Sequence, residues 1–211
     1  MPGDEPARDL VGRLRPLIAD RRVLEVIAST PRERFVPEAL RDHAYDNEAL
    51  PIAGGQTISQ PLVVARMLEL LELSGDELVL DVGTGSGYHA ALLAQLAREV
   101  VSIEVVSELH DAAAATLSEL GMRNVTCVLA DGWRGLPERA PYDAINVAAA
   151  SGRQPPARLL EQLAPGGRMV VPVGRRRQRL TVVWRDNDGQ VGAETLEPVR
   201  FVPLVRRDQG A

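Results

Sequence analysis

The sequence predicts an α/β fold in which a mostly parallel sheet carries helices on both faces and ends in an antiparallel hairpin. Short runs of branched apolar residues, typical of buried strands, alternate with segments of helical periodicity along most of the chain. A glycine-rich turn joins the first of these strands to its helix. Near the C-terminus, two alternating segments flank Asn-Asp-Gly at residues 187–189, which is a strong hairpin signal. Alternating strands and helices favour parallel pairing, and the hairpin adds antiparallel strands.

The length of the chain allows one such domain with an N-terminal extension. At 211 residues it is long enough for a full α/β core and too short for two well-grown domains. We therefore expect residues 1–60 to supply N-terminal helices and a loop, and residues 61–211 to hold the sheet. The two parts are expected to pack into one compact unit.

The N-terminal part is predicted to be helical as far as Pro31. Leucine, valine and isoleucine recur at spacings of three and four across residues 7–29, with a second helix beginning near Asp20. Pro31 ends this pattern because its ring cannot continue a helix. A short helix is expected over residues 37–43.

Residues 45–61 lose this periodicity and are predicted to form a long ordered loop rather than a regular element. Loops of this length in compact domains are often functional. Pro61 suits the first position of a helix over residues 61–71. We expect Ser59 or Gln60 to cap that helix.

The strand predicted over residues 77–82 runs into a turn with glycine at every second position, Gly83, Gly85 and Gly87. Without side chains there, the backbone can turn sharply and a ligand can lie against bare peptide groups. A helix follows from Tyr88, and its free N–H groups face the turn. A dinucleotide fold needs Gly or Ala where Tyr88 stands, and a Walker loop needs a lysine, which the chain lacks. The turn therefore predicts a different nucleotide-like cofactor.

Acidic residues at the ends of three predicted strands support a cofactor site. Asp81 lies at the end of the first strand, the second (residues 100–104) closes on Glu104, and the third (residues 124–130) is followed by Asp131. Glu104 stands about twenty residues after the first glycine, where a carboxylate usually grips a ribose. Asp81 is expected near a cationic part of the cofactor. Each acid alone could be a loop carboxylate or a helix cap, but three in this arrangement favour the site.

The rest of the chain completes the predicted sheet. The order of its edge strands is left open. We expect a fourth strand at residues 142–150, followed by a helix at 155–163 that Pro-Gly-Gly closes. A fifth strand is expected at 168–173, and the two hairpin strands at 178–185 and 191–199.

Composition excludes several function classes. The net charge of −5 gives no reason to expect a nucleic acid or an anionic membrane as partner. All 24 basic residues are arginine, so lysine Schiff-base chemistry is excluded. Cys127 is the only cysteine, and His43, His89 and His110 lack metal-ligand spacing, so no metal site is expected. With no membrane-length apolar run and no signal-peptide pattern, we expect a cytoplasmic protein that acts as a monomer.

The glycine turn resembles the cofactor loop of class I S-adenosylmethionine-dependent methyltransferases. Over nearly its whole length the chain further resembles the protein-L-isoaspartate O-methyltransferase family. The motifs that carry this resemblance are Arg-Phe-Val-Pro (34–37), Leu-Pro-Ile (50–52), Gln-Thr-Ile-Ser-Gln-Pro (56–61), the glycine loop (81–88), Asp-Gly (131–132), Ala-Pro-Tyr-Asp (140–143), Leu-Glu-Gln-Leu (160–163), Pro-Gly-Gly (165–167) and Val-Arg-Phe-Val-Pro-Leu (199–204).

This resemblance implies a Rossmann-like class I methyltransferase fold and methyl transfer from S-adenosylmethionine to the α-carboxylate of L-isoaspartyl residues in damaged proteins and peptides. It marks Ser59 as the active-site serine, and Thr57, Ile58 and Ser59 as substrate-binding residues. The cofactor-binding residues it implies are Asp81, Gly83, Gly85, Gly87, Glu104, Asp131 and Gly132. Ser59 is expected to donate a hydrogen bond to the substrate carboxylate, and the plainer alternative is that it only caps the following helix.

Some alternatives stay open. The family usually carries a Thr-Ala-Ala-Ala-Pro-like run where this chain has Ala-Ala-Ala-Ser-Gly-Arg at residues 148–153. Because that run borders the peptide site, the enzyme could instead esterify a dedicated biosynthetic peptide. A binding-only module would have a damaged glycine loop, and a nucleobase methyltransferase would have an Asn-Pro-Pro-Tyr-like motif after the fourth strand; neither is seen. Arg175, Arg176, Arg177 and Arg179 form either a solvated turn or a surface that attracts acidic peptides.

Overall fold

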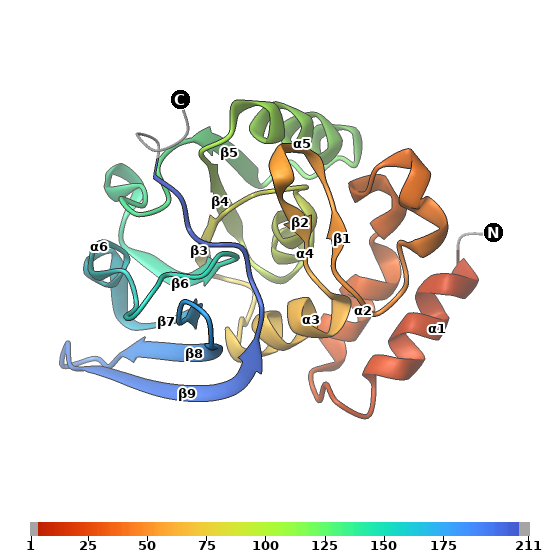
Figure 1. Cartoon of the computed structure of the whole chain (residues 1–211). Coiled ribbons are helices and arrows are strands. Elements are labelled where there is room, and N and C mark those ends of the chain that lie inside the picture. The colour runs from red at the N-terminus through yellow and green to blue at the C-terminus, as the bar shows by residue number, and fades with distance from the viewer. Residues whose placement is uncertain (1–3, 207–211) are drawn as a thin grey trace.

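The computed structural model describes residues 4–206, which are built around a seven-stranded sheet in the order β5-β4-β3-β6-β7-β8-β9 (Figure 1). The five strands from β5 to β7 are parallel to one another, and β8 and β9 are antiparallel. This confirms the predicted α/β fold and settles the order of the edge strands. The strands are β3 (Leu78–Val82), β4 (Glu99–Glu104), β5 (Val125–Leu129), β6 (Tyr142–Val147), β7 (Leu163–Val173), β8 (Gln178–Arg185) and β9 (Val191–Val199).

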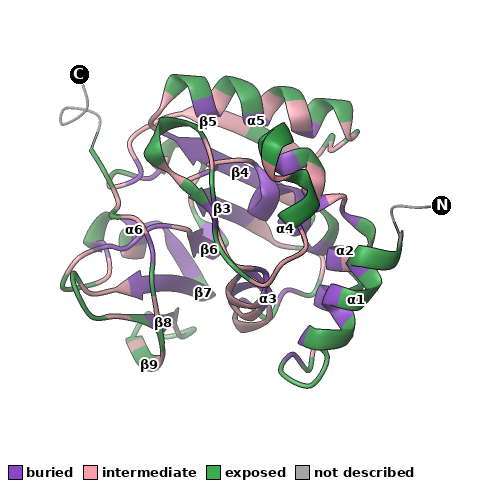
Figure 2. Cartoon of the chain, turned by 45° about the vertical axis from the view of Figure 1, so that its right-hand side comes forward, coloured by how far each residue is buried: buried purple, intermediate pink, exposed green. Residues whose placement is uncertain are grey.

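Helices cover both faces of the sheet because successive strand residues point to opposite sides. Val79 and Val100 belong to the apolar core shared with α1 to α4, whereas Leu80 and Val101 pack in a second core with Leu159 of α6. Figure 2 shows buried residues along the central strands and the inner sides of the helices. The helices are α1 (Asp4–Leu14), α2 (Arg21–Ser29), α3 (Pro61–Leu70), α4 (Tyr88–Leu96), α5 (Ser107–Glu119) and α6 (Ala157–Glu161).

The N-terminal helices form as predicted and pack against the sheet domain. The Asp20 side chain caps α2 by accepting a hydrogen bond from the Arg22 N–H at 2.8 Å. α2 in turn contacts α3 and α4. The short helix expected over residues 37–43 is a 3₁₀ helix, Glu38–His43. The boundary at residue 60 stays a prediction, and residues 1–3 and 207–211 of the two expected parts lie outside the described residues.

The prediction of an irregular loop over residues 45–61 was wrong in part. Two short strands, β1 (Leu50–Pro51) and β2 (Thr57–Ile58), pair there as a small antiparallel hairpin around a 3₁₀ turn, Ala53–Gly55. Strands of two residues are too short to show a periodic pattern. The hairpin tip packs on α5, where the Cα of Gly54 faces Val106 and Leu109.

The prediction that Pro-Gly-Gly (165–167) closes a helix was also wrong. α6 ends at Glu161, and the three residues lie inside β7, where the pairing with β6 shifts register. Gly166 has φ +77°, and a Cβ on Gly167 would lie 2.8 Å from the Ala164 carbonyl oxygen. Pro-Gly-Gly therefore forms an irregular, closely packed stretch of strand, although the same letters usually signal a turn.

Candidate active site

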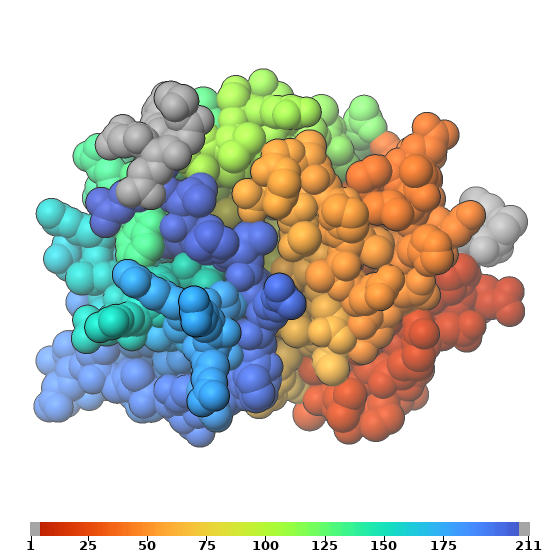
Figure 3. All heavy atoms as spheres, in the orientation of Figure 1, coloured from red at the N-terminus to blue at the C-terminus, as the bar shows by residue number. Residues whose placement is uncertain are grey.

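A cleft lies at the carboxyl ends of β3, β4 and β6. These strands are neighbours in the sheet, and the strand order reverses at β3, with β4 on one side of it and β6 on the other. Open α/β sheets bind their ligands at this position. Its walls are the glycine turn, the end of β4, the β1–β2 hairpin and the C-terminal strap, which we define as residues 202–205. Figure 3 shows the strap in blue beside the hairpin in orange. Of the residues predicted for the site, Thr57, Gly83, Gly85, Glu104 and Gly132 line the cleft.

The cleft is narrow as it stands. It encloses about 60 Å³, whereas ligand pockets typically hold ~300–1,000 Å³. The strap and the hairpin close over it from two sides. Entry of a nucleoside-sized ligand therefore requires one of these segments to move.

The glycine turn has the left-handed backbone that its sequence predicts. Gly83, Gly85 and Gly87 have φ of +91°, +53° and +89°, which side chains rarely adopt. The N–H groups of Gly83 and Thr84 both donate to the Ile103 carbonyl oxygen, at 2.9 and 3.1 Å. The turn is thus fastened to the end of the neighbouring strand.

Glu104 makes a second connection to the turn. Its Oε2 accepts a hydrogen bond from the Gly85 N–H at 2.9 Å, and its Oε1 accepts from the Val105 and Val106 N–H groups at 2.8 and 3.0 Å. A carboxylate has about four acceptor positions, so one remains for a ligand hydroxyl. Glu104 is therefore held in place beside the cleft before any ligand arrives.

Asp81 is fully buried and lies beneath the cleft rather than in its lining. Its oxygens accept hydrogen bonds from the Ser102 hydroxyl at 2.7 Å and the Asn146 amide at 2.8 Å. Ser102 is also hydrogen-bonded to the Thr84 hydroxyl at 2.6 Å, so this short network reaches the glycine turn. Burial raises the pKa of Asp81 to about 6.

Replacing Asp81 with asparagine should change how stability depends on pH. An acid whose pKa is raised from 3.8 to about 6 in the folded state binds its proton more tightly there, so the free energy of unfolding falls as pH rises through this interval. The variant loses that contribution. Measured by urea unfolding, its stability relative to wild type should rise by on the order of 2–3 kcal/mol between pH 4 and pH 7. Asp143→Asn, at an exposed carboxylate of β6, is the control, and an equal rise there would contradict the assignment.

Asp131 and Gly132 follow β5 and hold the base of the strap. The Asp131 carboxylate accepts a hydrogen bond from the Trp133 N–H at 2.9 Å, and the Trp133 indole N–H donates to the Leu204 carbonyl oxygen at 3.0 Å. A Cβ on Gly132 would lie 2.8 Å from Val82 and 2.9 Å from Leu204. Only glycine lets the strap lie this close to the sheet.

Ser59 lies between β2 and α3, and it does not cap the helix. Instead, the Asn47 side chain accepts a hydrogen bond from the Leu62 N–H at 3.0 Å, and Gln60 at the cap position makes no side-chain cap bond. The prediction of capping by Ser59 or Gln60 was therefore wrong, because the cap comes from the preceding loop. Among the described residues, the Ser59 hydroxyl has no hydrogen-bond partner. It is half-buried and free to bind another molecule.

Arg32 holds the backbone at Ser59, and sequence reasoning missed it. Its guanidinium is fully buried and donates to the carbonyl oxygens of Ser59 at 2.7 Å and Ala44 at 2.8 Å. It also lies over the Tyr88 ring, 4.7 Å from the centroid. The sequence Pro-Arg-Glu-Arg-Phe gives no sign of which arginine turns inward.

Residues 4–206 offer neither a metal site nor a membrane-spanning helix. No group of three His, Cys, Asp or Glu side chains in this range is arranged to hold a metal ion. Within the same range, no helix combines the length and the apolar character needed to cross a bilayer.

Comparisons with known proteins agree with one another. Residues 7–209 match the family model described as protein-L-isoaspartate(D-aspartate) O-methyltransferase (PCMT). The protein-L-isoaspartate O-methyltransferase 2 of Syntrophobacter fumaroxidans is 48% identical over 203 residues, which cover 95% of this chain and 82% of that protein. The protein-L-isoaspartate O-methyltransferase of Serratia proteamaculans is 50% identical over 189 residues and covers 90% of each chain.

Solved structures show the same fold. A protein-L-isoaspartate O-methyltransferase structure aligns with TM-score 0.86 and 27% identity, over 95% of this chain and 66% of that one. A Plasmodium falciparum structure, described as a beta-aspartate methyltransferase (PCMT) in complex with S-adenosyl-L-homocysteine, aligns with TM-score 0.82 and 24% identity over 94% of this chain and 98% of that one. The match over nearly the whole chain leaves no ambiguity: this chain belongs to the protein-L-isoaspartate(D-aspartate) O-methyltransferase family.

Proposed function

We propose that this chain is a protein repair enzyme that transfers a methyl group from S-adenosylmethionine to the α-carboxylate of L-isoaspartyl residues in damaged proteins and peptides. The observation that carries this is the family match over residues 7–209. Two further features support it. The glycine turn is bound to Glu104, and the Ser59 hydroxyl, which has no partner within residues 4–206, lies two residues after Thr57, which lines the cleft.

The residues of the cleft fit an adenosyl cofactor. The glycine turn would lie against it, Glu104 would bind the ribose hydroxyls with its remaining acceptor position, and Asp131 would accept from the adenine amino group. Asp81 lies one layer below, where it would support the turn through Ser102 and add negative charge beneath a cationic ligand. When bound, the cofactor supplies a methyl group already activated by a sulfonium.

The reaction needs little chemical equipment from the protein. A substrate carboxylate is ionised and nucleophilic at neutral pH, so no general base is required. Alignment of the carboxylate and exclusion of water are the remaining tasks. The Ser59 hydroxyl would donate a hydrogen bond to one carboxylate oxygen and so direct the other towards the methyl group. The resulting ester loses methanol when the adjacent backbone nitrogen attacks it, and the succinimide formed then hydrolyses in part to normal aspartate.

The scope of the substrate is a separate proposal. Ala148 and Ala149 of the atypical 148–153 run line the cleft, and Ala150 pairs with Pro203 of the strap. The run therefore shapes the wall that a polypeptide would meet. We favour general repair over a dedicated biosynthetic peptide, and a cytoplasmic monomer without a nucleic-acid or membrane partner.

The function is tested with two synthetic peptides that are identical except for isoaspartate or aspartate at one position. With methyl-labelled S-adenosylmethionine, we expect label only on the isoaspartyl peptide, followed by release of labelled methanol. Ser59→Ala should lower kcat/KM for that peptide by about 10–100-fold, the effect of one hydrogen bond to a charged group, without weakening cofactor binding. Ser118→Ala, on the exposed side of α5, is the control. Wild-type turnover by a folded Ser59→Ala variant would refute the role of Ser59, and labelling of neither peptide would refute the function.

A further inference from the structure

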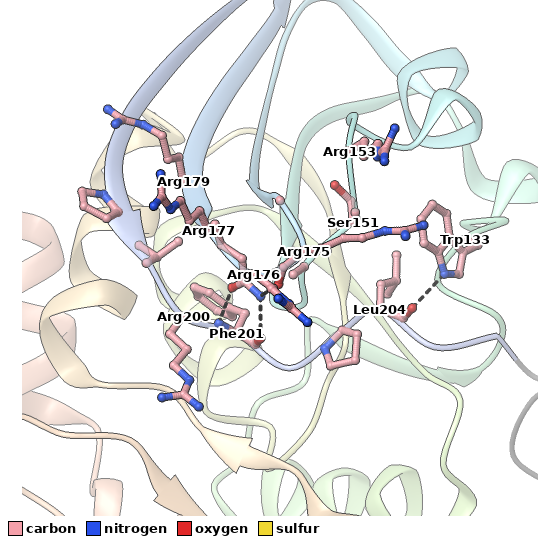
Figure 4. Close-up of a pocket in the computed structure, with 17 residues that line it drawn as sticks. Trp133, Ser151, Arg153, Arg175, Arg176, Arg177, Arg179, Arg200, Phe201 and Leu204 are labelled. Carbon is pink, nitrogen blue, oxygen red and sulfur yellow. Dashed lines mark hydrogen bonds between the residues drawn. The ribbon is translucent and has the colours of Figure 1, made fainter.

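A second and much larger cavity lies on the other side of the C-terminal strap from the cleft. It encloses about 1240 Å³, and Pro203 and Leu204 of the strap line both spaces. Six arginines stand around this arginine cavity, and none of its lining residues is Asp or Glu (Figure 4). The six are Arg153, Arg175, Arg176, Arg177, Arg179 and Arg200.

The charge of this cavity opposes that of the protein. The chain has 29 acidic and 24 basic residues and a net charge of −5, yet a quarter of its arginines collect here. Elsewhere, arginines such as Arg66 and Arg139 pair with carboxylates. Among the described residues, the six guanidiniums of the cavity are exposed and have no hydrogen bond or ion pair. With no carboxylate among the lining residues, the combined field of these arginines attracts anions.

Backbone contacts hold together the three segments that carry these arginines. The Gly174 N–H donates to the Gly152 carbonyl oxygen at 2.5 Å, which joins the loop of Arg153 to the loop of Arg175. The Gln178 side chain binds both the N–H and the carbonyl of Phe201, at 2.6 and 3.0 Å. These three bonds join the loops of Arg153 and Arg175 to each other and to the segment just before the strap, so the backbone that carries the arginines is fixed rather than a free turn.

We propose that the arginine cavity binds acidic side chains of the substrate polypeptide, within a few residues of the isoaspartate. This rests on the proposed function and adds a preference in substrate sequence. The cleft is bounded by the hairpin and the strap, and the cavity begins where a chain would leave the cleft past the strap. Guanidinium groups bind carboxylates in a two-pronged geometry, and Phe201 and Trp133 offer apolar surface between them. A long polyanion fits less well, because its charges beyond the cavity would meet a net negative protein.

The test compares isoaspartyl peptides that differ only in a flanking pair of residues, Glu-Glu or Gln-Gln, placed on either side of the isoaspartate. In at least one placement we expect kcat/KM to be about 10-fold higher for the Glu-Glu peptide at low salt, and the advantage to shrink at 0.5 M NaCl. In the triple variant Arg175→Gln, Arg176→Gln, Arg177→Gln, the Glu/Gln ratio should approach 1. The matched control Arg15→Gln, Arg21→Gln, Arg123→Gln removes the same charge from exposed positions elsewhere and should keep the wild-type ratio.

The outcomes separate this inference from the function on which it rests. Labelling of both peptides with equal kcat/KM would overturn the cavity assignment and leave the methyltransferase function standing. Labelling of neither would refute the function itself. Loss of the ratio in the control variant would mean that overall charge, not the cavity, selects the peptide. Binding of a random single-stranded oligonucleotide to wild type but not to the triple variant, without a peptide preference, would identify the cavity as a nucleic-acid surface and overturn the proposal.

Discussion

Replacing Glu104 with alanine is expected to raise the Kd for S-adenosylmethionine by about 100-fold. The carboxylate holds the backbone N–H groups of Gly85, Val105 and Val106, and in the proposed complex it also receives the ribose. Hydrogen bonds to charged groups contribute about 1.5–3 kcal/mol each. The variant loses the hydrogen bond to the ribose. It also loses the bond to the Gly85 N–H that helps to shape the glycine turn. Isothermal titration with S-adenosylmethionine measures the effect.

The control for Glu104 is Glu77, which lies at the opposite end of β3. The Glu77 carboxylate likewise accepts two backbone N–H groups, from Ser74 at 2.7 Å and Gly75 at 2.9 Å. Glu77→Ala should lower thermal stability and leave the Kd for S-adenosylmethionine within about 3-fold of wild type, because it is remote from the cleft. A Glu104→Ala protein that still binds the cofactor as tightly as the Glu77→Ala protein would rule out the proposed role.

Replacing Arg32 with leucine should damage stability and activity together. Leucine leaves the buried carbonyl groups of Ser59 and Ala44 without donors, each at a cost of about 1–3 kcal/mol. We expect the free energy of unfolding to fall by about 3–5 kcal/mol and Tm by roughly 10 °C. Because the Ser59 backbone loses its anchor, kcat/KM for the isoaspartyl peptide should fall more than 10-fold even well below Tm, while the cofactor Kd changes little.

Arg185 offers a matched comparison for Arg32. Its guanidinium also donates to two backbone carbonyls, those of Leu160 and Leu163, both at 2.9 Å, but at the far end of β8. Arg185→Leu should lose stability while keeping wild-type peptide kinetics at a temperature where it is folded. Differential scanning calorimetry and initial rates on the same samples separate the two effects. Equal loss of activity in both variants would show that Arg32 acts only through global stability.

The elements that carry strong local signals could be predicted from the sequence. Branched apolar runs locate β3, β4 and β6 because parallel strands are buried on both faces. Alternating glycines locate the turn at Gly83 because only glycine adopts its backbone conformation readily. The Asn-Asp-Gly signal places the β8–β9 hairpin because these residues adopt the backbone conformation of a hairpin turn readily. In each case the local chain already determines the structure.

Features set by distant contacts could not be predicted in this way. The burial of Arg32 depends on carbonyls 12 and 27 residues away. The β1–β2 hairpin depends on α5 beneath its tip. The arginine cavity requires three segments that the sequence separates by some twenty residues or more, of which the run at Arg175 gave the only signal. The spacing of these arginines alone could not decide whether they form a solvated turn or a peptide-binding surface.

The strap gives the two cavities a common wall, and this has a kinetic consequence. The cofactor cannot reach the narrow cleft unless the strap or the hairpin moves, and the strap also borders the arginine cavity. A polypeptide that holds the strap closed would slow the dissociation of the cofactor from the cleft and its replacement by a new cofactor molecule. By thermodynamic reciprocity, a polypeptide that tightens cofactor binding is itself bound more tightly, by the same factor, when the cofactor is present. Residence time of the spent cofactor would then depend on the partner in the neighbouring cavity, and turnover on how quickly that partner departs.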